Sequence, residues 1–161
     1  MALPQAAPES ARIPLRELLL QRYEMLLLDE LLEVGPEHLE VSAHVPAEHP
    51  LVDAVLGMPA WVGIEMMAQA VSAFSGLELR ALGLPPRIGL LLGTRSYETR
   101  VPFFAPGDLL NVRVALAMRD AAGLGVFDCT IHRQGVLVAQ AQVKGYMPDD
   151  IDAFLESGAH G

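Results

Sequence analysis

The sequence contains almost no cysteine and no long hydrophobic run, and each absence excludes a class of protein. Cys129 is the only cysteine among 161 residues, so neither an internal disulfide bond nor a cysteine-based metal cluster can form. No apolar run approaches the roughly 18 to 20 residues of a membrane-spanning helix. The first residues also lack a basic segment followed by an apolar one. We therefore expect a cytoplasmic protein.

Basic side chains are also scarce. The chain has 11 Lys and Arg against 20 Asp and Glu, a formal net charge of −9, and no clustered basic face offsets it, which argues against nucleic acid as a partner. The histidines are dispersed, and no pair stands at helical ligand spacing beside a carboxylate, so no metal site is expected. No glycine-rich loop follows a strand and opens a helix. We therefore expect chemistry without a cofactor.

Apolar residues, in contrast, are abundant. They make up 52% of the chain, and charged residues only 19%, which argues against disorder and suggests that some apolar surface is buried in an oligomer. The length suits one domain. We expect a loose tail at 1–12, the folded domain at 13–147, and an acidic tail at 148–161 that contains a short helix.

The longest apolar segment, residues 58–76, has the pattern of a helix. Pro59 suits the first helical position, and Gly76 suits the left-handed residue that ends a helix. The pattern leaves open whether the helix continues past Gly76 toward Leu82. Because its side chains are apolar on nearly all sides, we expect a core helix that protein surrounds on most sides.

One narrow polar stripe interrupts this helix. Glu65, Gln69 and Ser72 stand at i, i+4 and i+7, so they share one face. An ionised carboxylate removed from water loses several kcal/mol of solvation free energy, so Glu65 suggests a hydrogen-bonded pair, a raised pKa or catalytic chemistry. The alternative is structural, because Glu65 would also suit a backbone hydrogen bond or a wet groove.

Alternating residues mark the expected strands. Residues 38–45 alternate with period two, and Gly35 and Pro36 separate them from 25–34, so we expect a β-hairpin although the Leu and Glu of 25–34 favour helix by propensity. A short helix at 13–21 precedes the hairpin. Four further strands are expected to form a meander over residues 87–100, 108–119, 126–133 and 136–146. An α+β fold of the hot-dog type, an antiparallel sheet wrapped around one long helix, satisfies this order most simply.

Three motifs in this order resemble the β-hydroxyacyl-[acyl carrier protein] dehydratases. Residues 18–29 read LLLQRYEMLLLD, similar to the family's opening LLPHRYPFLLVD. Residues 58–69 read MPAWVGIEMMAQ and resemble the family's Met-Pro-Gly helix start followed by Glu-Ala-Met-Ala-Gln. Residues 101–108, VPFFAPGD, resemble its Pro-Val-Xaa-Pro-Gly-Asp turn. The sequence of residues 59–65 most resembles that of dehydratase-like proteins of aryl-polyene pathways.

The departures from this family pattern concern histidine. The family's catalytic loop reads His-Phe-Pro-Gly, and this chain has Leu51 where that histidine is expected. His49 lies two residues earlier, as if the loop had gained two residues. The family's early Pro-His pair is Leu20 and Gln21 here, so a second familiar histidine is absent.

The resemblance implies dehydration of a β-hydroxyacyl thioester to a trans-2-enoyl thioester. His49 is the candidate base for the α-proton, because the unperturbed pKa of histidine lies near working pH; the alternative is an ordinary surface-loop histidine between Glu48 and Pro50. Glu65 is the candidate acid for the departing hydroxyl, because an apolar wall favours its protonated form. In hot-dog dimers, as the resemblance implies, the acid comes from the facing subunit.

Further site residues follow from the same resemblance. Backbone N–H groups near Gly57 and Met58, at the start of the helix, would polarise the thioester carbonyl. Trp61 and Gln69 complete the expected substrate-binding set. Gln69 either holds the Glu65 carboxyl in place or satisfies a backbone carbonyl.

The expected partner is acyl carrier protein, which presents the substrate on 4′-phosphopantetheine. Because the carrier is acidic, we expect a local basic rim for docking, with Arg87 and Arg95 as candidates; ordinary surface solvation is the alternative for these arginines. We expect a homodimer or a hetero-oligomer with a related hot-dog subunit. Two other functions stay open, a non-catalytic hot-dog partner subunit and an acyl thioesterase, and so does the choice between acyl carrier protein and coenzyme A.

Overall fold

The computed structural model describes residues 13–148 and 151–158. The predicted tail at 1–12 lies outside the described residues, and so do residues 149–150 and 159–161 of the predicted acidic tail. Within that acidic tail, α2 (Ile151–Gly158) is the expected short helix.

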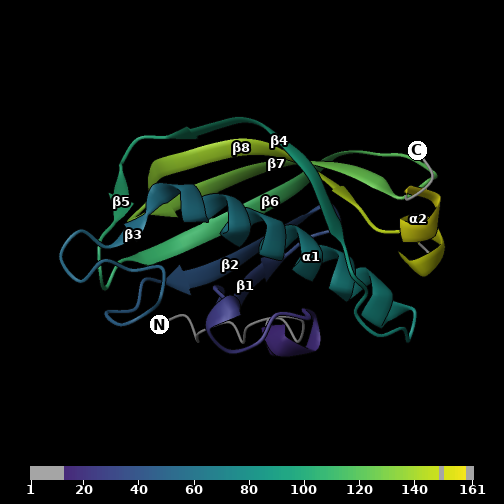
Figure 1. Cartoon of the computed structure of the whole chain (residues 1–161), viewed down its shortest axis with the longest axis horizontal. Coiled ribbons are helices and arrows are strands. Elements are labelled where there is room, and N and C mark those ends of the chain that lie inside the picture. Colours follow the sequence, from purple (N-terminus) through teal and green to yellow (C-terminus); the bar gives the residue numbers. More distant parts are fainter. Residues whose placement is uncertain (1–12, 149–150, 159–161) are drawn as a thin grey trace, which may run out of the picture.

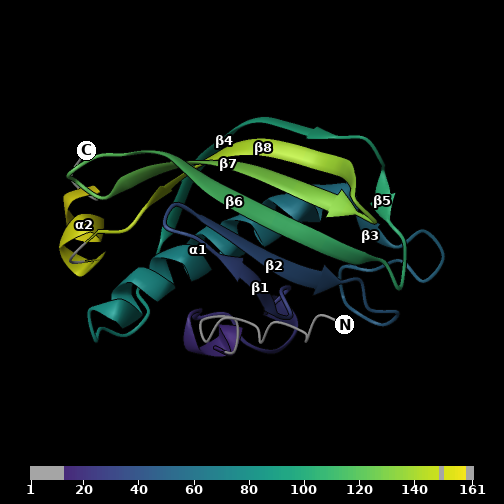
Figure 2. The same ribbon diagram turned by 180° about the vertical axis from the view of Figure 1, so that it is seen from behind.

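One antiparallel sheet forms the body of the molecule. Its strands lie in the order β1-β2-β6-β7-β8-β4, and the helix α1 crosses one face of it (Figure 1). Seen from behind, the other face of the sheet lies in front of α1 (Figure 2). The strands are β1 (Leu31–Val34), β2 (His38–His44), β4 (Leu90–Thr99), β6 (Leu109–Arg119), β7 (Leu124–Arg133) and β8 (Val136–Tyr146). The predicted architecture, a sheet around one long helix, is confirmed.

The predicted meander is wrong at one strand. β6, β7 and β8 pair in sequence order, but β4 pairs with β8 rather than with β6. The chain leaves β4 and first forms β5 (Phe103–Phe104), which pairs with β3 (Met58–Pro59) in a separate two-stranded sheet. This detour carries the chain from one edge of the sheet to its middle, so β4 becomes an edge strand.

The segment before the hairpin is less regular than predicted. The expected helix at 13–21 is only a three-residue 3-10 turn, Leu15–Glu17, and a second such turn follows at Tyr23–Met25. β1 begins at Leu31 rather than at residue 25. Further upstream, the N–H of Leu27 donates to the side chain of Gln69 on α1 (3.0 Å), whereas the backbone of Asp29 and Glu30 already bonds to Ser42 of β2.

The helix α1 (Gly63–Ala81) begins later than predicted, and of the two ends that the sequence left open it takes the later one. Pro59 lies in β3, and a 3-10 turn, Ala60–Val62, leads into the helix. Gly76 does not end α1. A Cβ at Gly76 would lie 2.5 Å from the carbonyl oxygen of Leu18, so glycine is required there for the close approach of another segment.

The helix ends instead at a Schellman motif built on Gly83. This glycine has φ +71°, its N–H donates to Arg80 O (2.9 Å), and the N–H of the next residue donates to Leu79 O (2.9 Å). These two bonds satisfy carbonyls that the end of a helix leaves unpaired, and a left-handed residue is needed to make them.

The two sides of α1 face different surroundings. Met66, Met67, Ala70 and Ala73 are completely buried, and they belong to the core between the helix and the sheet. On the other side Ala68, Ser72 and Ser75 remain partly exposed. The sheet therefore covers one side of the helix, and the other side is available for a site.

Candidate functional site

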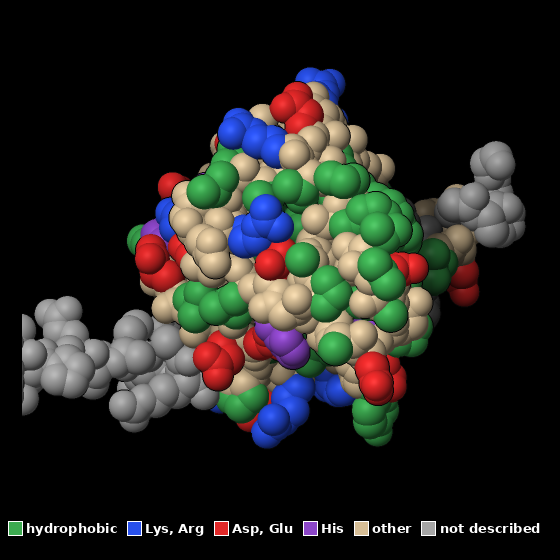
Figure 3. Space-filling view, turned by 90° about the vertical axis from the view of Figure 1, so that its left-hand side faces the viewer, with side chains coloured by type: hydrophobic (Ala, Val, Ile, Leu, Met, Phe, Trp, Pro, Cys, Tyr) green, Lys and Arg blue, Asp and Glu red, His purple; other side chains and the backbone are tan. Residues whose placement is uncertain are grey.

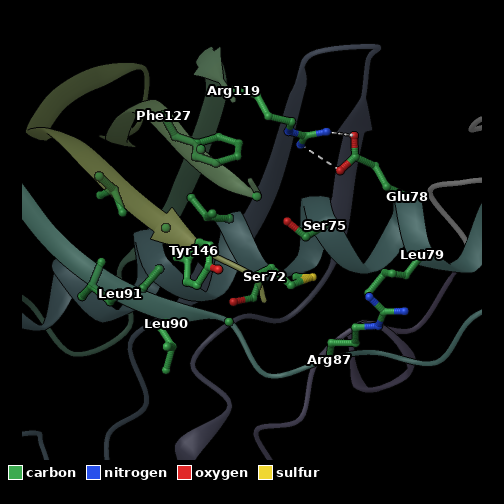
Figure 4. Close-up of a pocket in the computed structure, with 18 of the residues that line it drawn as sticks. Ser72, Ser75, Glu78, Leu79, Arg87, Leu90, Leu91, Arg119, Phe127 and Tyr146 are labelled. Atoms are coloured by element: carbon green, nitrogen blue, oxygen red, sulfur yellow. Dashed lines mark hydrogen bonds and ion pairs between the residues drawn. The ribbon is translucent and has the colours of Figure 1, made fainter. Parts of the chain in front are cut away.

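The partly exposed side of α1 lines a cavity of about 600 Å³. Its lining residues along the helix run from Glu65 to Leu82, a stretch of about 25 Å at 1.5 Å per helical residue. Ser72 and Ser75 come from the helix, and Leu90 and Leu91 come from the strand β4 beside it (Figure 4). An elongated cavity with this shape suits an extended ligand.

The far wall of the cavity is apolar. It is formed by Phe127 of β7 and Val143 of β8, and Tyr146 stands at the end of β8. Polar groups of the lining come from α1, which contributes Glu65, Glu78 and two serines, and from Arg87 and Arg119 outside the helix. An apolar wall opposite a few polar groups is the usual composition of a small-molecule site.

Glu65 lies in the first turn of α1, on the surface of this cavity. It is partly exposed, so it does not lie inside the apolar wall that the sequence suggested. The amide nitrogen of Gln69 donates a hydrogen bond to Glu65 Oε1 (3.0 Å). One carboxylate oxygen is therefore held by the helix, and the carboxyl group is oriented.

Gln69 connects α1 to the segment that precedes the sheet. Its side chain is completely buried. The amide nitrogen also donates to Met25 O (2.7 Å), and the amide oxygen accepts the N–H of Leu27 (3.0 Å). Gln69 thus performs both roles that the sequence left open, because it holds Glu65 and also satisfies the backbone.

Replacing Gln69 by leucine should destabilise the fold. The buried N–H of Leu27 and the carbonyl of Met25 would both lose their partner, and each unsatisfied buried group costs about 1–3 kcal/mol. We expect the free energy of unfolding to fall by about 3 kcal/mol, measured by urea denaturation. Gln140→Leu is the control, because Gln140 is exposed and bonds only Glu98. A Gln69→Leu variant as stable as this control would contradict a stabilising role of these Gln69 hydrogen bonds.

His49 is held by its own chain in a loop near the start of α1. Its Nδ1 accepts the N–H of Leu51 (3.0 Å), and its Nε2 lies 2.8 Å from the carbonyl oxygen of Glu24. A carbonyl only accepts, so Nε2 carries the proton and the ring is a donor on that side. Both ring nitrogens therefore have backbone partners.

The other residues predicted to bind substrate lie beside the start of α1. Gly57 has φ +99°, and a Cβ there would overlap the carbonyl oxygen of Phe104. Its N–H donates to Asp53 O (2.9 Å), so that amide is already bonded. The Met58 side chain is completely buried, whereas Trp61 is 62% exposed. Figure 3 shows hydrophobic side chains gathered at this end of the molecule.

The two arginines predicted to dock the carrier lie in different places. Arg87 lines the cavity near Leu79 (Figure 4). Arg95 lies on β4 in a shallow depression that also contains Glu98 and Asp128. Arg87 is therefore adjacent to the candidate site, and Arg95 has acidic neighbours outside it.

Comparison with protein families identifies the family of the chain. Residues 13–156 match the ApeP-like family, described as ApeP dehydratase. The chain belongs to the ApeP-like dehydratase family. A search of curated proteins gave no match.

Solved structures agree with this ApeP-like assignment and confirm the hot-dog fold. A chain of the dehydratase heterocomplex ApeI:P from Xenorhabdus doucetiae is 26% identical in sequence to this one. The two superpose with a TM-score of 0.80 over 89% of this chain and 96% of that chain. The PaaI protein of E. coli, from the phenylacetic acid degradation operon, is 16% identical, with a TM-score of 0.56 over 72% of this chain and 80% of that chain. A hypothetical thioesterase with coenzyme A from Streptococcus pneumoniae is 20% identical, with a TM-score of 0.52 over 73% and 84%. The latter two show the fold alone.

This ApeP-like chain shows neither a metal cluster nor a spanning helix in the part that the structure describes. Among residues 13–148 and 151–158, no three His, Cys, Asp or Glu side chains are grouped so that they would hold a metal ion. None of the helices in these ranges has the length and apolar character needed to cross a membrane.

The sequence did not indicate the ion pair at the far end of the cavity. Arg119, at the end of β6, donates two hydrogen bonds of 2.8 Å to the carboxylate of Glu78 on α1 (Figure 4). The guanidinium carbon also lies 5.8 Å from the centre of the Phe74 ring. No local signal predicts this pair, because the two residues are 41 positions apart.

A partly buried tyrosine and a buried cysteine make the stability of this ApeP-like protein decrease at alkaline pH. Burial raises the pKa of the Tyr97 hydroxyl from 10.0 to about 12. Burial, with a smaller effect of Asp128, raises the pKa of the Cys129 thiol from 9.0 to about 12. The unfolded chain loses these protons first, so the stabilisation is complete below pH 9.0 and is lost as pH rises toward 12.

We expect the melting temperature to fall across this pH range. Cys129→Ala should remove the part of the fall that begins near pH 9.0, and Tyr97→Phe the part that begins near pH 10.0. A series of thermal melts at increasing pH measures this. If the melting temperature fell equally steeply with pH in the wild type and in the double variant, Tyr97 and Cys129 would not be the cause of the fall.

Proposed function

We propose that this chain takes part in dehydrating β-hydroxyacyl groups on acyl carrier protein to trans-2-enoyl thioesters, within a hot-dog assembly. One observation carries the proposal: an oriented carboxylate, Glu65, stands at the end of an elongated cavity with an apolar wall. Membership of the ApeP-like dehydratase family supports it. Fatty-acid synthesis and polyene synthesis both supply substrates of this class.

In the proposed reaction Glu65 is the acid. The base removes the α-proton, the double bond forms, and the β-hydroxyl leaves as water with the proton that Glu65 donates. The cavity along α1 would hold the acyl chain or the pantetheine arm against Leu90, Leu91 and Phe127. Apolar walls favour such a chain by about 25 cal/mol for each Å² that is buried.

His49 is the proposed base, and its bonds set a condition for that role. Nε2 carries the proton toward Glu24 O, so the ring accepts another proton only if Nδ1 releases the N–H of Leu51. Binding of substrate at a subunit interface would have to move this loop. The N–H of Gly57 is bonded to Asp53 O, so it is not the proposed donor to the thioester oxygen. Backbone N–H groups of Met58 and of the turn around Trp61 are proposed instead.

The proposed assembly forms through the free edge of β4. Among the described strands, β4 has only β8 as a neighbour, and Ile88, Leu91 and Leu92 are about half exposed on or beside it. An exposed apolar edge strand is a template for pairing with another chain. The partner would be a second copy or a related hot-dog subunit, as in the ApeI:P heterocomplex.

A second candidate function is a non-catalytic subunit of such an assembly. The bonding of both His49 ring nitrogens favours it, because a ring whose two nitrogens are both bonded to backbone groups is not available as a base. In that case the chain would complete the binding site of a catalytic partner.

The experiment is an assay with a 3-hydroxyacyl group on acyl carrier protein, with mass spectrometry of the acyl-carrier product. The chain is tested alone and with a co-expressed hot-dog partner. Loss of one water from the substrate supports the proposal. Loss of water only in the presence of the partner, unaffected by Glu65→Gln in this chain, supports the non-catalytic subunit instead. Release of free thiol would identify a thioesterase and refute both proposals.

Docking of the acidic carrier is proposed to use Arg87 on the cavity rim. Arg87→Glu should raise the KM for the carrier-linked substrate by about tenfold at low salt, and the difference should shrink as salt increases. Arg95→Glu is the matched control, because Arg95 lies outside the cavity. Equal effects of the two reversals would contradict a specific rim.

A further inference from the structure

A β-bulge in the edge strand β4 turns one side chain toward the start of α1. Opposite β8, the register steps from Arg95 to Glu98 on β4 while it steps only from Gln142 to Gln140 on β8. β4 therefore contains one extra residue at this point. Ser96 within it has φ +56°, a left-handed conformation that is unfavourable for a residue with a Cβ. Bulges commonly redirect a side chain near functional sites.

The side chain next to this strained residue is Tyr97. It is partly buried and packs against the core, and its hydroxyl donates a hydrogen bond to the carbonyl oxygen of Ala60. Ala60 belongs to the 3-10 turn that leads into α1. The bulge therefore connects the edge of the sheet to the turn that precedes Glu65.

The turn is fixed from several directions. The Ala60 carbonyl also accepts the N–H of Gly63, so both of its lone pairs are used. The Ala60 N–H donates to Pro102 O (3.0 Å). At Gly63 a Cβ would overlap the Tyr97 hydroxyl and would lie 2.9 Å from Ile131 Cδ1. Glycine at the first position of α1 is therefore what admits the hydroxyl.

We infer that Tyr97 is a positioning residue that sets the direction of the first turn of α1 and, through it, the carboxyl group of Glu65. This inference rests on the proposed dehydratase function. Tyr97 does not line the cavity that contains Glu65, so it acts through Ala60 and does not touch the substrate. A strained bulge, the hydroxyl of a partly buried tyrosine and an obligatory glycine meet at this one carbonyl, and a purely stabilising contact would not require all three.

The test uses Trp61 as a reporter. It is the only tryptophan of the chain, it follows Ala60 in the same turn, and it is 62% exposed. In Tyr97→Phe we expect lower Trp61 fluorescence anisotropy, a fall in kcat of about tenfold or more through misplacement of the carboxyl group, and a KM within about twofold of wild type. Tyr23→Phe is the matched control, because Tyr23 is 90% exposed and should leave all three values unchanged.

A double-mutant cycle keeps the inference testable if Tyr97→Phe proves unstable. Gly63→Ala displaces the hydroxyl without removing it, so its effect on anisotropy and on kcat should be smaller in the Tyr97→Phe background than in the wild type. Additive effects would overturn the inference. So would an unchanged Trp61 signal in Tyr97→Phe, or a changed signal with wild-type kcat. If the wild type shows no dehydration at all, the proposed function fails, while the Trp61 comparison still decides whether Tyr97 positions the turn.

Discussion

Replacing Glu65 by glutamine is expected to lower turnover of a carrier-linked β-hydroxyacyl substrate by about 10²- to 10⁴-fold, the usual contribution of a general acid. Glutamine has the same shape and can still accept the hydrogen bond from Gln69, but it cannot donate a proton to the leaving hydroxyl with an acid's strength. The measurement is kcat by mass spectrometry of the acyl-carrier product, in the assembly that is active.

The control for this variant is Glu37→Gln. Glu37 is exposed in the turn between β1 and β2, and its carboxyl group does not line the cavity. We expect it to retain wild-type turnover. Both variants should show wild-type melting temperatures, because Glu65 is partly exposed and its loss of charge leaves no buried group unpaired. A Glu65→Gln variant with wild-type kcat would remove the carboxyl group from the mechanism.

The second large effect is expected at His49, where two substitutions distinguish two roles. His49→Ala should lower turnover by about 10²- to 10⁴-fold if the ring is the base. His49→Asn should be equally inactive in that case, because an amide is not basic. Asparagine nevertheless offers an oxygen where Nδ1 accepts the N–H of Leu51, so it can preserve the loop.

The pattern of the two variants decides between base and loop anchor. If His49→Asn keeps most of the activity while His49→Ala loses it, the imidazole organises the loop and another group takes the proton. His132→Asn is the control for a histidine in the sheet, since His132 lies on β7 and has no proposed role. The kcat of each variant should be measured together with its melting temperature, so that loss of fold is not mistaken for loss of chemistry.

The central helix and the hairpin were predictable from the sequence because their signals are local. The apolar pattern of 58–76 and the breaking pair Gly35 and Pro36 act over a few residues, and periodicity reports such short distances well. The spacing of Glu65 and Gln69 on one helical face also follows from local geometry, and the two side chains are indeed hydrogen-bonded. The order of these signals along the chain was sufficient for the hot-dog architecture.

Errors arose wherever a distant segment decided the local structure. Gly76 had the character of a helix end, but its lack of a Cβ accommodates Leu18. Residues 25–30 had strand character, but Gln69 binds the backbone of Met25 and Leu27, and only Asp29 and Glu30 bond to Ser42 of β2. Pro59 had the character of a helix start, but pairing with Phe103 places it in β3.

By itself the sequence determined the central helix, the hairpin and the strands that follow, and it placed Glu65 and Gln69 on one face of that helix, since these depend on residue spacing and on local backbone preference. Only the tertiary structure decided that β4 lies at the sheet edge, that the cavity runs along the serine side of α1, that both His49 nitrogens are bonded, and that Tyr97 holds the turn before Glu65. These are contacts between segments far apart in the chain, and their formation depends on which surfaces meet when the sheet closes over the helix.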